Sequence, residues 1–453
     1  MKKEPSEVKH SVKYFCHLAK KRNEINVTIA SNFYPSHTPP SPPSAKDFSN
    51  GIQGQNGKYA LEMSKVHEIK PFDRRWAWVE IDLGAIRHNT QEAYRALAPG
   101  TKLMAVVKAD AYGHGAVRCA KTALSAGASW LGVSNIEEGA VLRHSGINAP
   151  ILLLAQPPIT AIPMLIGYNI TPTIYTADFA VAYGEFAQSF DAEAKFHLKI
   201  NTGMNRIGVR HDEVLEFFRQ TSFHPALKLE GVFTHFASAD VESFNDTKKQ
   251  YARFQDALKA MREAGINPGI VHAANSAALF RFQDTHFDMV REGIALYGYQ
   301  PADKTETIVN LRPAMSVKAR ITAVNHVPLG EGVSYGLYYK SPGSVKICTI
   351  PLGYADGLRR NLSGSFDLEY EGIRCRQVGN ICMDQCMFEV NLRTYVNGVH
   401  LSPEIGDHVT VVGQGGKDNP GATIEDLASI LGSNAHEVAI GFAQRMQRIY
   451  INA

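Results

Sequence analysis

Between residues 102 and 293, short apolar runs alternate with longer amphipathic segments, and this alternation limits the folds open to the chain. Intervening segments such as VRCAKTALSAG and TKKQYARFQDALKAMREAG predict helices, the second of which ends at Gly265. Strands are expected near KLMAVV (102–107), WLGVS (130–134), ILLL (151–154), ITPTIY (170–175), KFHLKI (195–200), KLEGVF (228–233), IVHAA (270–274) and DMVREG (288–293). Strands joined by helices in this number predict a (β/α)8 barrel, with a doubly wound open sheet as the alternative.

The pattern changes near residue 311. The runs SVKARITAVNHV, GSVKICTIPLGY, RCRQVGNICMDQCMFEV and GDHVTVVG are typical of β-strands joined by glycine-containing turns. One helix is expected in TIEDLASILG, with Thr423 as its N-cap and Asp426 three residues later. We therefore predict a barrel domain over residues 73–310, followed by a mostly β domain over residues 311–453.

The first 72 residues differ in composition from the rest of the chain. They carry 11 Lys and Arg against 6 Asp and Glu, and SHTPPSPPSAKDFSNGIQGQNGK is rich in Pro, Ser, Gly and Asn. Such a composition offers little apolar surface to bury, which predicts a disordered extension over residues 1–72. Met63 is an alternative start, and we expect residues 1–62 to contribute nothing to catalysis.

Composition also argues against several classes of partner. The formal net charge of the chain is only +3, with no basic stripe that would indicate nucleic-acid binding. No apolar run is long enough to predict a membrane span. The 6 cysteines form no CxxC motif and no histidine pair has zinc spacing, so we expect no metal site. In so large a chain, these cysteines indicate reduced thiols and a cytoplasmic protein.

Polar residues gather where the expected barrel strands end. In such barrels the C-terminal ends of the strands form the face that carries the active site. The polar residues at or beyond these ends are Lys108, Lys199, Arg206, His235, His272, Asn275, Ser276 and Arg291. Each has an ordinary structural explanation when taken alone, such as capping a helix or pointing into solvent. Their convergence on one face predicts an active site.

Lys108 raises the question of which chemistry this face performs. A lysine amine that attacks a carbonyl must lose its proton, which requires a partly desolvated pocket. The loops after the last two strands of such barrels often bind phosphate, and Ser276, Gly293 and Ile294 lie there. With the Tyr112 phenol four residues after Lys108, this set indicates pyridoxal 5'-phosphate, its aldehyde bonded to the lysine.

Over residues 76–450 the chain resembles the alanine racemase family, whose members are fold-type III pyridoxal-phosphate enzymes. The motifs that carry the resemblance are WVEIDLGAIRHN, AVVKADAYGHG, HLKINTGMNRIGV, FTHFASAD, HAANSAALF, MVREGIALYG, GEGVSYG, IPLGYADG and VGNICMDQ. The resemblance implies a homodimer that interconverts L-alanine and D-alanine by a two-base mechanism and supplies D-alanine for peptidoglycan.

Roles for single residues follow from the resemblance as expectations. Lys108 would carry the cofactor and act as one base, and Tyr335, supplied by the partner subunit, would be the second base. Met383, also from the partner subunit, would help bind substrate, and Tyr354 would line the entrance. Lys199 matches a position that is carbamylated in many members. The residues that would contact the cofactor are Lys108, Tyr112, Arg206, His235, Asn275, Ser276, Arg291, Gly293 and Ile294, and Arg206 would also bind the substrate carboxylate.

Three positions depart from the family pattern. Asn201 stands where aspartate is usual, and Asn205 precedes Arg206 where glycine or histidine is common. Gln444 stands where many members have a tyrosine that contacts the phosphate, which predicts a roomier pocket. A racemase of broader specificity, acting for example on serine, is therefore the alternative.

Two other classes of pyridoxal-phosphate protein fit the sequence less well. Fold-type III decarboxylases favour an acidic residue facing the pyridine nitrogen, where this chain has Arg291. Single-domain carrier barrels, which are not enzymes, lack the second domain that contains VSYG and CMDQ.

Overall fold

The computed structural model describes residues 76–221, 224–302, 309–391, 395–396, 399–415, 421–442 and 445–453. The predicted extension over residues 1–72, the alternative start Met63 and the departure at Gln444 all lie outside these described residues. The boundaries given above for the extension, the barrel domain and the β domain stay predictions.

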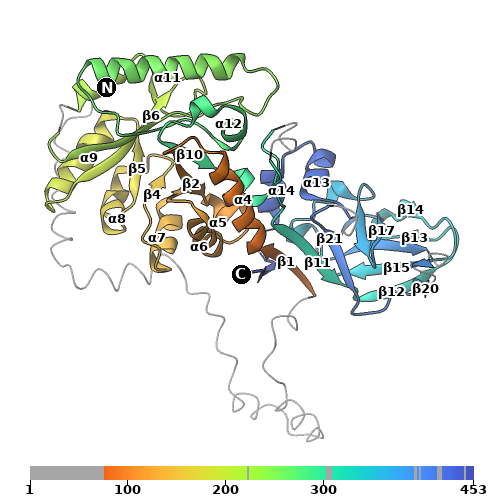
Figure 1. Cartoon of the computed structure of the whole chain (residues 1–453). Coiled ribbons are helices and arrows are strands. Elements are labelled where there is room, and N and C mark those ends of the chain that lie inside the picture. The colour runs from red at the N-terminus through yellow and green to blue at the C-terminus, as the bar shows by residue number, and fades with distance from the viewer. Residues whose placement is uncertain are drawn as a thin grey trace, which may run out of the picture. The chain divides into compact units, whose positions relative to one another are not determined.

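A closed barrel of parallel strands forms the first part of the described chain (Figure 1). Its strands are β2 (Lys102–Val106), β3 (Trp130–Val133), β4 (Ile151–Leu153), β5 (Thr171–Ile174), β6 (Ala194–Asn201), β8 (Leu227–Phe233), β9 (Ile270–His272) and β10 (Met289–Glu292). The strand β2 pairs with β3 and β10, and the pairing of β5 with β6 completes the ring. Each expected strand thus overlaps a barrel strand, and the closed ring excludes the doubly wound open sheet.

Helices connect the barrel strands and cover their outer side. They are α4 (Leu83–Ala96), α6 (Ala116–Ala126), α7 (Ile136–His144), α8 (Ile162–Gly167), α9 (Ala177–Gln188), α10 (Val214–Gln220), α11 (Asn245–Glu263) and α12 (Ser276–Arg281). The helix α11 ends just before Gly265, whose φ of +74° suits glycine and confirms the expected stop. None of the described helices is both long and apolar enough to cross a membrane.

The second large sheet has nine strands and is mostly antiparallel. In order across the sheet they are β12 (Ala323–Val327), β15 (Val345–Ile350), β18 (Cys386–Asn391), β17 (Ile373–Val378), β16 (Asp367–Tyr370), β21 (His408–Val412), β11 (Met315–Arg320), β1 (Ala77–Asp82) and β22 (Gln447–Ile451). The strand β1 lies within the range expected for the barrel domain, yet it pairs with β11 and β22 in this sheet. An alternating apolar pattern shows that a strand forms but not which sheet it joins.

Two helices near the C-terminus join this sheet to the barrel. The helix α13 (Ile424–Leu431) begins at the expected N-cap, because Thr423 and Asp426 form a reciprocal capping box. The helix α14 (Ala435–Gly441) packs on the segment that follows Lys108. A Cβ atom added to Gly113 would lie 2.9 Å from the carbonyl oxygen of Ala439 in α14. The end of the chain therefore packs directly against the barrel face that was predicted to carry the site.

Candidate active site

Lys108 begins a short left-handed turn at the end of β2. The segment α5 (Lys108–Tyr112) follows the strand, and its residues Ala109 to Tyr112 have φ values between 51° and 56°. Left-handed backbone costs L-amino acids about 1–2 kcal/mol per residue, so such a turn persists only where contacts hold it. The turn is followed by Gly113 and Gly115, whose φ values of +84° and +95° glycine adopts without strain.

Contacts with three other elements hold the turn in place. The backbone N–H of Ala109 donates to Glu138 of α7 at 2.8 Å. The Asp110 carboxylate accepts from the first N–H of α6 at 2.7 Å and forms an ion pair with Arg448 of β22 at 3.1 Å. Arg448 also donates from Nε to the carbonyl oxygen of Gly113 at 2.8 Å. The backbone that carries Lys108 is thus fixed from several directions.

The Lys108 amine lies in a setting that favours its neutral form. Its side chain is half-buried, and its Nζ lies 5.9 Å from the centre of the Tyr112 ring. Burial lowers the pKa of Lys108, the nearby Arg206 guanidinium lowers it further, and Glu138 opposes both. A partly desolvated amine with a lowered pKa is what attack on a carbonyl requires.

Ser276 and Asn275 organise the start of α12. The Asn275 side chain accepts from the N–H of Ala278 at 3.0 Å, so Asn275 is the N-cap of this helix. The Ser276 hydroxyl accepts from the backbone N–H groups of Gly293 at 2.8 Å and Ala295 at 3.4 Å. Its own proton is then available to a further acceptor.

The Tyr112 phenol meets the Ser276 hydroxyl around Gly293. A Cβ atom added to Gly293 would lie 3.0 Å from the Tyr112 oxygen and 3.7 Å from the Ser276 oxygen. Burial raises the pKa of Tyr112, so its phenol stays protonated and can donate. Ile294 begins the short 3-10 helix η4 (Ile294–Tyr297), whose first N–H has no acceptor within its own turn. Two hydroxyls and this N–H around a glycine fit a phosphate group.

Among the described residues, the hydrogen bonds of the buried Arg291 guanidinium all go to neutral acceptors. It donates to the Nδ1 atoms of His272 at 2.9 Å and His235 at 3.1 Å, and to the carbonyl oxygens of Thr234 and Ala273 at 2.8 Å. Burial lowers the pKa of Arg291 to about 9, which leaves it charged at neutral pH. Since arginine can only donate, this residue suits an unprotonated ring nitrogen of a cofactor.

Burial lowers the pKa of two further barrel residues, Lys199 and His235. Lys199 is 4% exposed, and its Nζ donates to the carbonyl oxygen of Ile200 and lies 5.0 Å from the Phe233 ring centre. Burial, followed by Arg291 and Arg206, lowers the pKa of Lys199 well below its usual value. Burial and Arg291 do the same to the pKa of His235. A neutral buried amine is a nucleophile toward carbon dioxide, as carbamylation requires.

Asn201 preserves the loop that carries Arg206. Its amide oxygen accepts from the backbone N–H groups of Gly203 at 3.1 Å and Asn205 at 3.0 Å. Asn205 has a φ of +58°, a conformation that asparagine tolerates better than most residues. Arg206 itself is exposed at the rim of the barrel. The two departures from the family pattern at Asn201 and Asn205 therefore leave a folded loop with its acceptor in place.

The remaining predicted residues form a second group on the β domain. Tyr335 is 71% exposed, Met383 is 53% exposed and Tyr354 is 41% exposed. The Asn380 side chain donates to the carbonyl oxygen of Tyr335 at 2.6 Å, and the Tyr354 N–H donates to that of Cys382 at 3.0 Å. Backbone contacts thus bring these three residues into one exposed region. In the described part of this chain, no hydrogen bond or ring contact joins them to Lys108.

Sequence reasoning missed several residues around the barrel site. The His436 ring of α14 lies against that of Tyr112, with ring centres 5.5 Å apart. Glu138 and Arg448, which hold the left-handed turn, were also missed, because no local pattern reveals contacts so distant in sequence. His197 was detectable, since it lies two residues before Lys199 and therefore shares its inward face of β6.

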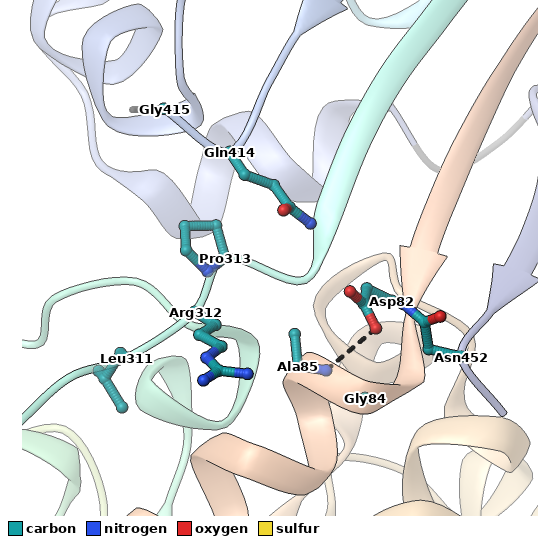
Figure 2. A pocket seen from close by; sticks show the side chains of 9 residues that line it. All are labelled: Asp82, Gly84, Ala85, Leu311, Arg312, Pro313, Gln414, Gly415 and Asn452. Carbon is teal, nitrogen blue, oxygen red and sulfur yellow. Dashed lines mark hydrogen bonds between the residues drawn. The ribbon is translucent and has the colours of Figure 1, made fainter. Parts of the chain in front are cut away.

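A cavity of about 450 Å³ lies away from these residues (Figure 2). It is lined by Asp82, Gly84, Ala85, Leu311, Arg312, Pro313, Gln414, Gly415 and Asn452. The hydrogen bond drawn in Figure 2 is the 3.1 Å contact from the Ala85 N–H to Asp82, an ordinary N-cap of α4. None of the predicted site residues lines this cavity, and nothing in it indicates chemistry.

Known proteins match this arrangement over most of the described chain. The family model for the alanine racemase N-terminal domain matches residues 81–301, and that for the C-terminal domain matches residues 314–450. An alanine racemase of Desulfovibrio desulfuricans is 41% identical over 381 residues, covering 84% of this chain and 99% of the relative.

Solved structures agree with the sequence matches. An alanine racemase of Clostridium difficile 630 superimposes with a TM-score of 0.76 and 36% identity, covering 83% of this chain and 96% of that one. The alanine racemase of Bartonella henselae with covalently bound pyridoxal phosphate gives a TM-score of 0.73 and 28% identity, over 83% of this chain and 99% of that one. The chain belongs to the alanine racemase family of pyridoxal-phosphate-dependent isomerases.

Proposed function

We propose that this chain interconverts L-alanine and D-alanine. The observation that carries the proposal is the Lys108 amine, which is half-buried, has a lowered pKa and stands on a fixed turn. It lies near Tyr112, whose phenol meets the Ser276 hydroxyl around Gly293, and this group would bind the cofactor phosphate. In this role the enzyme supplies D-alanine for peptidoglycan.

The residues of the barrel divide the work of holding the cofactor. Tyr112, Ser276 and the N–H of Ile294 bind the phosphate, while Gly293 leaves room for it. Arg291 would donate to the ring nitrogen. Held by these residues, pyridoxal phosphate would supply an electron sink that acidifies the α-proton of an amino acid bonded to it in place of Lys108.

Two bases then move the proton between the faces of the α-carbon. Lys108 takes or returns it on one face, and its lowered pKa increases the fraction of the amine that is neutral and can act as a base. Tyr335 takes or returns it on the other face. Arg206 binds the substrate carboxylate, and carbamylated Lys199 orients Arg206 through the negative charge that it gains.

The second base comes from a second copy of the chain. Tyr335 lies in an exposed aromatic and apolar segment with Leu337 and Tyr338, which are 71%, 52% and 84% exposed. Such residues are costly to leave in water together and are enriched at protein interfaces. Met383 and Tyr354 lie in the same region, so a homodimer would complete the substrate-binding end of each site.

The proposed compartment is the cytoplasm. The described cysteines, Cys119, Cys348, Cys375, Cys382 and Cys386, are all free, and all except Cys382 are buried. Free thiols in this number are typical of a reducing compartment.

The function is tested with the purified, cofactor-loaded protein. It should convert L-alanine and D-alanine to the same mixture, as measured by chiral chromatography. L-serine and L-lysine, supplied separately, test for broader specificity. Absence of alanine racemisation in protein with bound cofactor would contradict the proposal. Faster turnover of serine than of alanine would show that serine is the preferred substrate.

The shared site is tested by mixing two inactive variants, Lys108→Ala and Tyr335→Phe. If each site combines Lys108 of one chain with Tyr335 of the other, a hybrid dimer has one intact site and one doubly altered site. Random exchange of subunits should then restore roughly a quarter of the wild-type activity. If both residues came from the same chain, every site in the mixture would lack one base and no activity would return.

A further inference from the structure

A line of side chains crosses the barrel interior from Arg291 to Glu230, a residue with no role assigned above. Arg291 donates to Nδ1 of His272 at 2.9 Å, and Nε2 of His272 lies 2.8 Å from Nδ1 of His197. The other ring nitrogen of His197, Nε2, lies 3.7 Å from Oε2 of Glu230. The line connects β10, β9, β6 and β8, and both histidines are fully buried.

The contacts at the two ends of this line, with Arg291 and with Glu230, together favour one order of the protons along it. Since arginine has only donors, Nδ1 of His272 is an acceptor, and the neutral ring carries its proton on Nε2. That proton is donated to Nδ1 of His197, whose own proton is then on Nε2 and points toward Glu230. Burial lowers the pKa of both His197 and His272, which keeps the rings neutral and this order intact.

The reverse order would remove the acceptor that Arg291 uses. With the protons exchanged, an N–H of His272 would face an N–H of the guanidinium across 2.9 Å. The contact between His197 and Glu230 favours the order in which both rings carry their proton on Nε2, because the carboxylate stabilises a proton on Nε2 of His197. At 3.7 Å this contact is electrostatic rather than a hydrogen bond, and Nε2 of His197 has no hydrogen-bond partner among the described residues.

The local structure holds Glu230 and His197 for this contact. Thr171 of β5 donates to Oε2 of Glu230 at 3.1 Å. A Cβ atom added to Gly231 would lie 2.6 Å from Cε1 of His197, so the neighbouring glycine leaves the space that the ring occupies. Partial burial raises the pKa of Glu230, but its contacts with His197 and Thr171 hold it below the usual value, and the carboxylate is charged.

We propose that Glu230 is a positioning residue for racemisation, acting through His197 and His272 to hold Arg291 as a fixed donor toward the cofactor ring. The kinetic part of this inference rests on the proposed function. The proton order of the two histidines does not depend on it and can be measured separately.

The test compares three variants of the cofactor-loaded protein. Glu230→Leu removes the acceptor, Glu230→Gln keeps an acceptor without the charge, and Glu193→Gln is the control. Glu193 is a nearby exposed acid that pairs with Lys228 at 2.8 Å and takes no part in the line. Nitrogen-15 NMR of the histidine rings reports which nitrogen carries the proton, and kcat and KM for L-alanine report the reaction.

We expect Glu230→Leu to lose the single Nε2–H form of His197 and His272. Its kcat should fall about tenfold, the lower end of what loss of an outer partner costs at ligating histidines. Its KM should change less than about twofold, because substrate contacts are untouched. Glu230→Gln should keep the proton order and most of the rate, and Glu193→Gln should match the wild type.

The inference is overturned if Glu230→Leu keeps both the proton order and the wild-type kcat, which would make Glu230 an ordinary surface acid beside Lys195. If Glu230→Leu does not fold, His197→Phe decides in its place. An unchanged Nε2–H signal of His272 and an unchanged kcat in that variant would equally overturn the proposal. A wild type that binds cofactor but does not racemise alanine refutes the proposed function, while the NMR result still decides the proton order.

Discussion

The Arg448 guanidinium donates a hydrogen bond of 2.8 Å to the carbonyl oxygen of Gly113, a residue 335 positions earlier in the sequence. The same side chain forms an ion pair with Asp110 at 3.1 Å. Both contacts fall on the left-handed turn that carries Lys108. The last strand of the chain therefore helps to keep the reactive lysine on a backbone that is strained by itself.

Arg448→Met should loosen this turn while keeping much of the packing of the side chain. We expect a loss of about 1–3 kcal/mol in the free energy of unfolding, because the Gly113 carbonyl loses a charged donor and Asp110 loses its ion-pair partner. Cofactor affinity should fall as well, and both are measured by urea unfolding and cofactor titration. Arg359→Met is the matched control, since Arg359 pairs with Glu437 at the exposed surface and should contribute less than about 1 kcal/mol. Equal losses in the two variants would show that the turn does not depend on Arg448.

Gly115, which follows the left-handed turn after Lys108, packs closely against Tyr450 of β22. A Cβ atom there would lie 1.9 Å from the Tyr450 hydroxyl oxygen, and φ is +95°. Gly115→Ala should therefore destabilise the protein by clearly more than Gly146→Ala, where φ is +79° and no atom lies within 4 Å. Thermal unfolding measures the difference, and adding Tyr450→Phe to Gly115→Ala should recover part of it. If the two glycine variants lose the same stability, the loss comes from the positive φ alone and not from contact with Tyr450.

Much of this fold could be predicted from local patterns. Strand runs such as KLMAVV and ILLL are mostly apolar over the length of a barrel strand, and Thr423 with Asp426 marked the start of α13. The rim residues could be placed because the C-terminal ends of parallel barrel strands meet on one face. These inferences need only sequence neighbours and one rule of topology.

What could not be predicted depends on contacts between distant segments. The segment ADAY after Lys108 has no glycine, so nothing local indicates four successive residues with positive φ. The turn is held by Glu138 and Arg448, whose roles appear only when α7 and β22 are packed against it. The sheet that β1 joins is likewise decided by its partners β11 and β22.

The buried histidines predict how stability depends on pH. Burial lowers the pKa of His114 to about 4, so between about pH 6.5 and 4 the unfolded chain binds more protons at this residue than the folded one. Its contribution is fully present above about pH 6.5 and is lost on acidification by about 1.4 kcal/mol per pH unit. His197, His235 and His272 act in the same direction, whereas buried Glu292, whose pKa is raised, acts in the opposite one.

Replacing one of these histidines measures how much it contributes to the pH dependence of stability. His114→Gln should reduce the slope of unfolding free energy against pH by about one proton over the range between about pH 6 and 5. Urea unfolding at several pH values measures this slope in the variant and in the wild type. Parallel slopes for the two proteins would mean that His114 is not held neutral in the folded state.

The attachment of the cofactor to Lys108 predicts a specific covalent label. Reduction of the loaded enzyme with borohydride should leave a pyridoxyl group on the peptide that contains Lys108, as identified by mass analysis. Lys199 is a built-in comparison, because it too is buried with a lowered pKa but lies on β6. A label on Lys199, or on any other lysine, would contradict the assignment.

The two-base mechanism predicts that Tyr335→Phe separates the two faces of the α-carbon. This change keeps the ring and removes only the phenol, and because Tyr335 is exposed in the single chain it should leave folding intact. Racemisation must fall in both directions, since one equilibrium constant links the two rates. In deuterated water, however, the variant should still exchange the α-proton of D-alanine through Lys108, while exchange into L-alanine falls by about 10²–10⁴-fold, the usual contribution of a general acid–base group. The matching variant Lys108→Ala cannot serve as a control because it also loses the cofactor bond, so the comparison is between the two antipodes within Tyr335→Phe. Equal exchange into both would show that a single base serves both faces and that Tyr335 has no part in proton transfer.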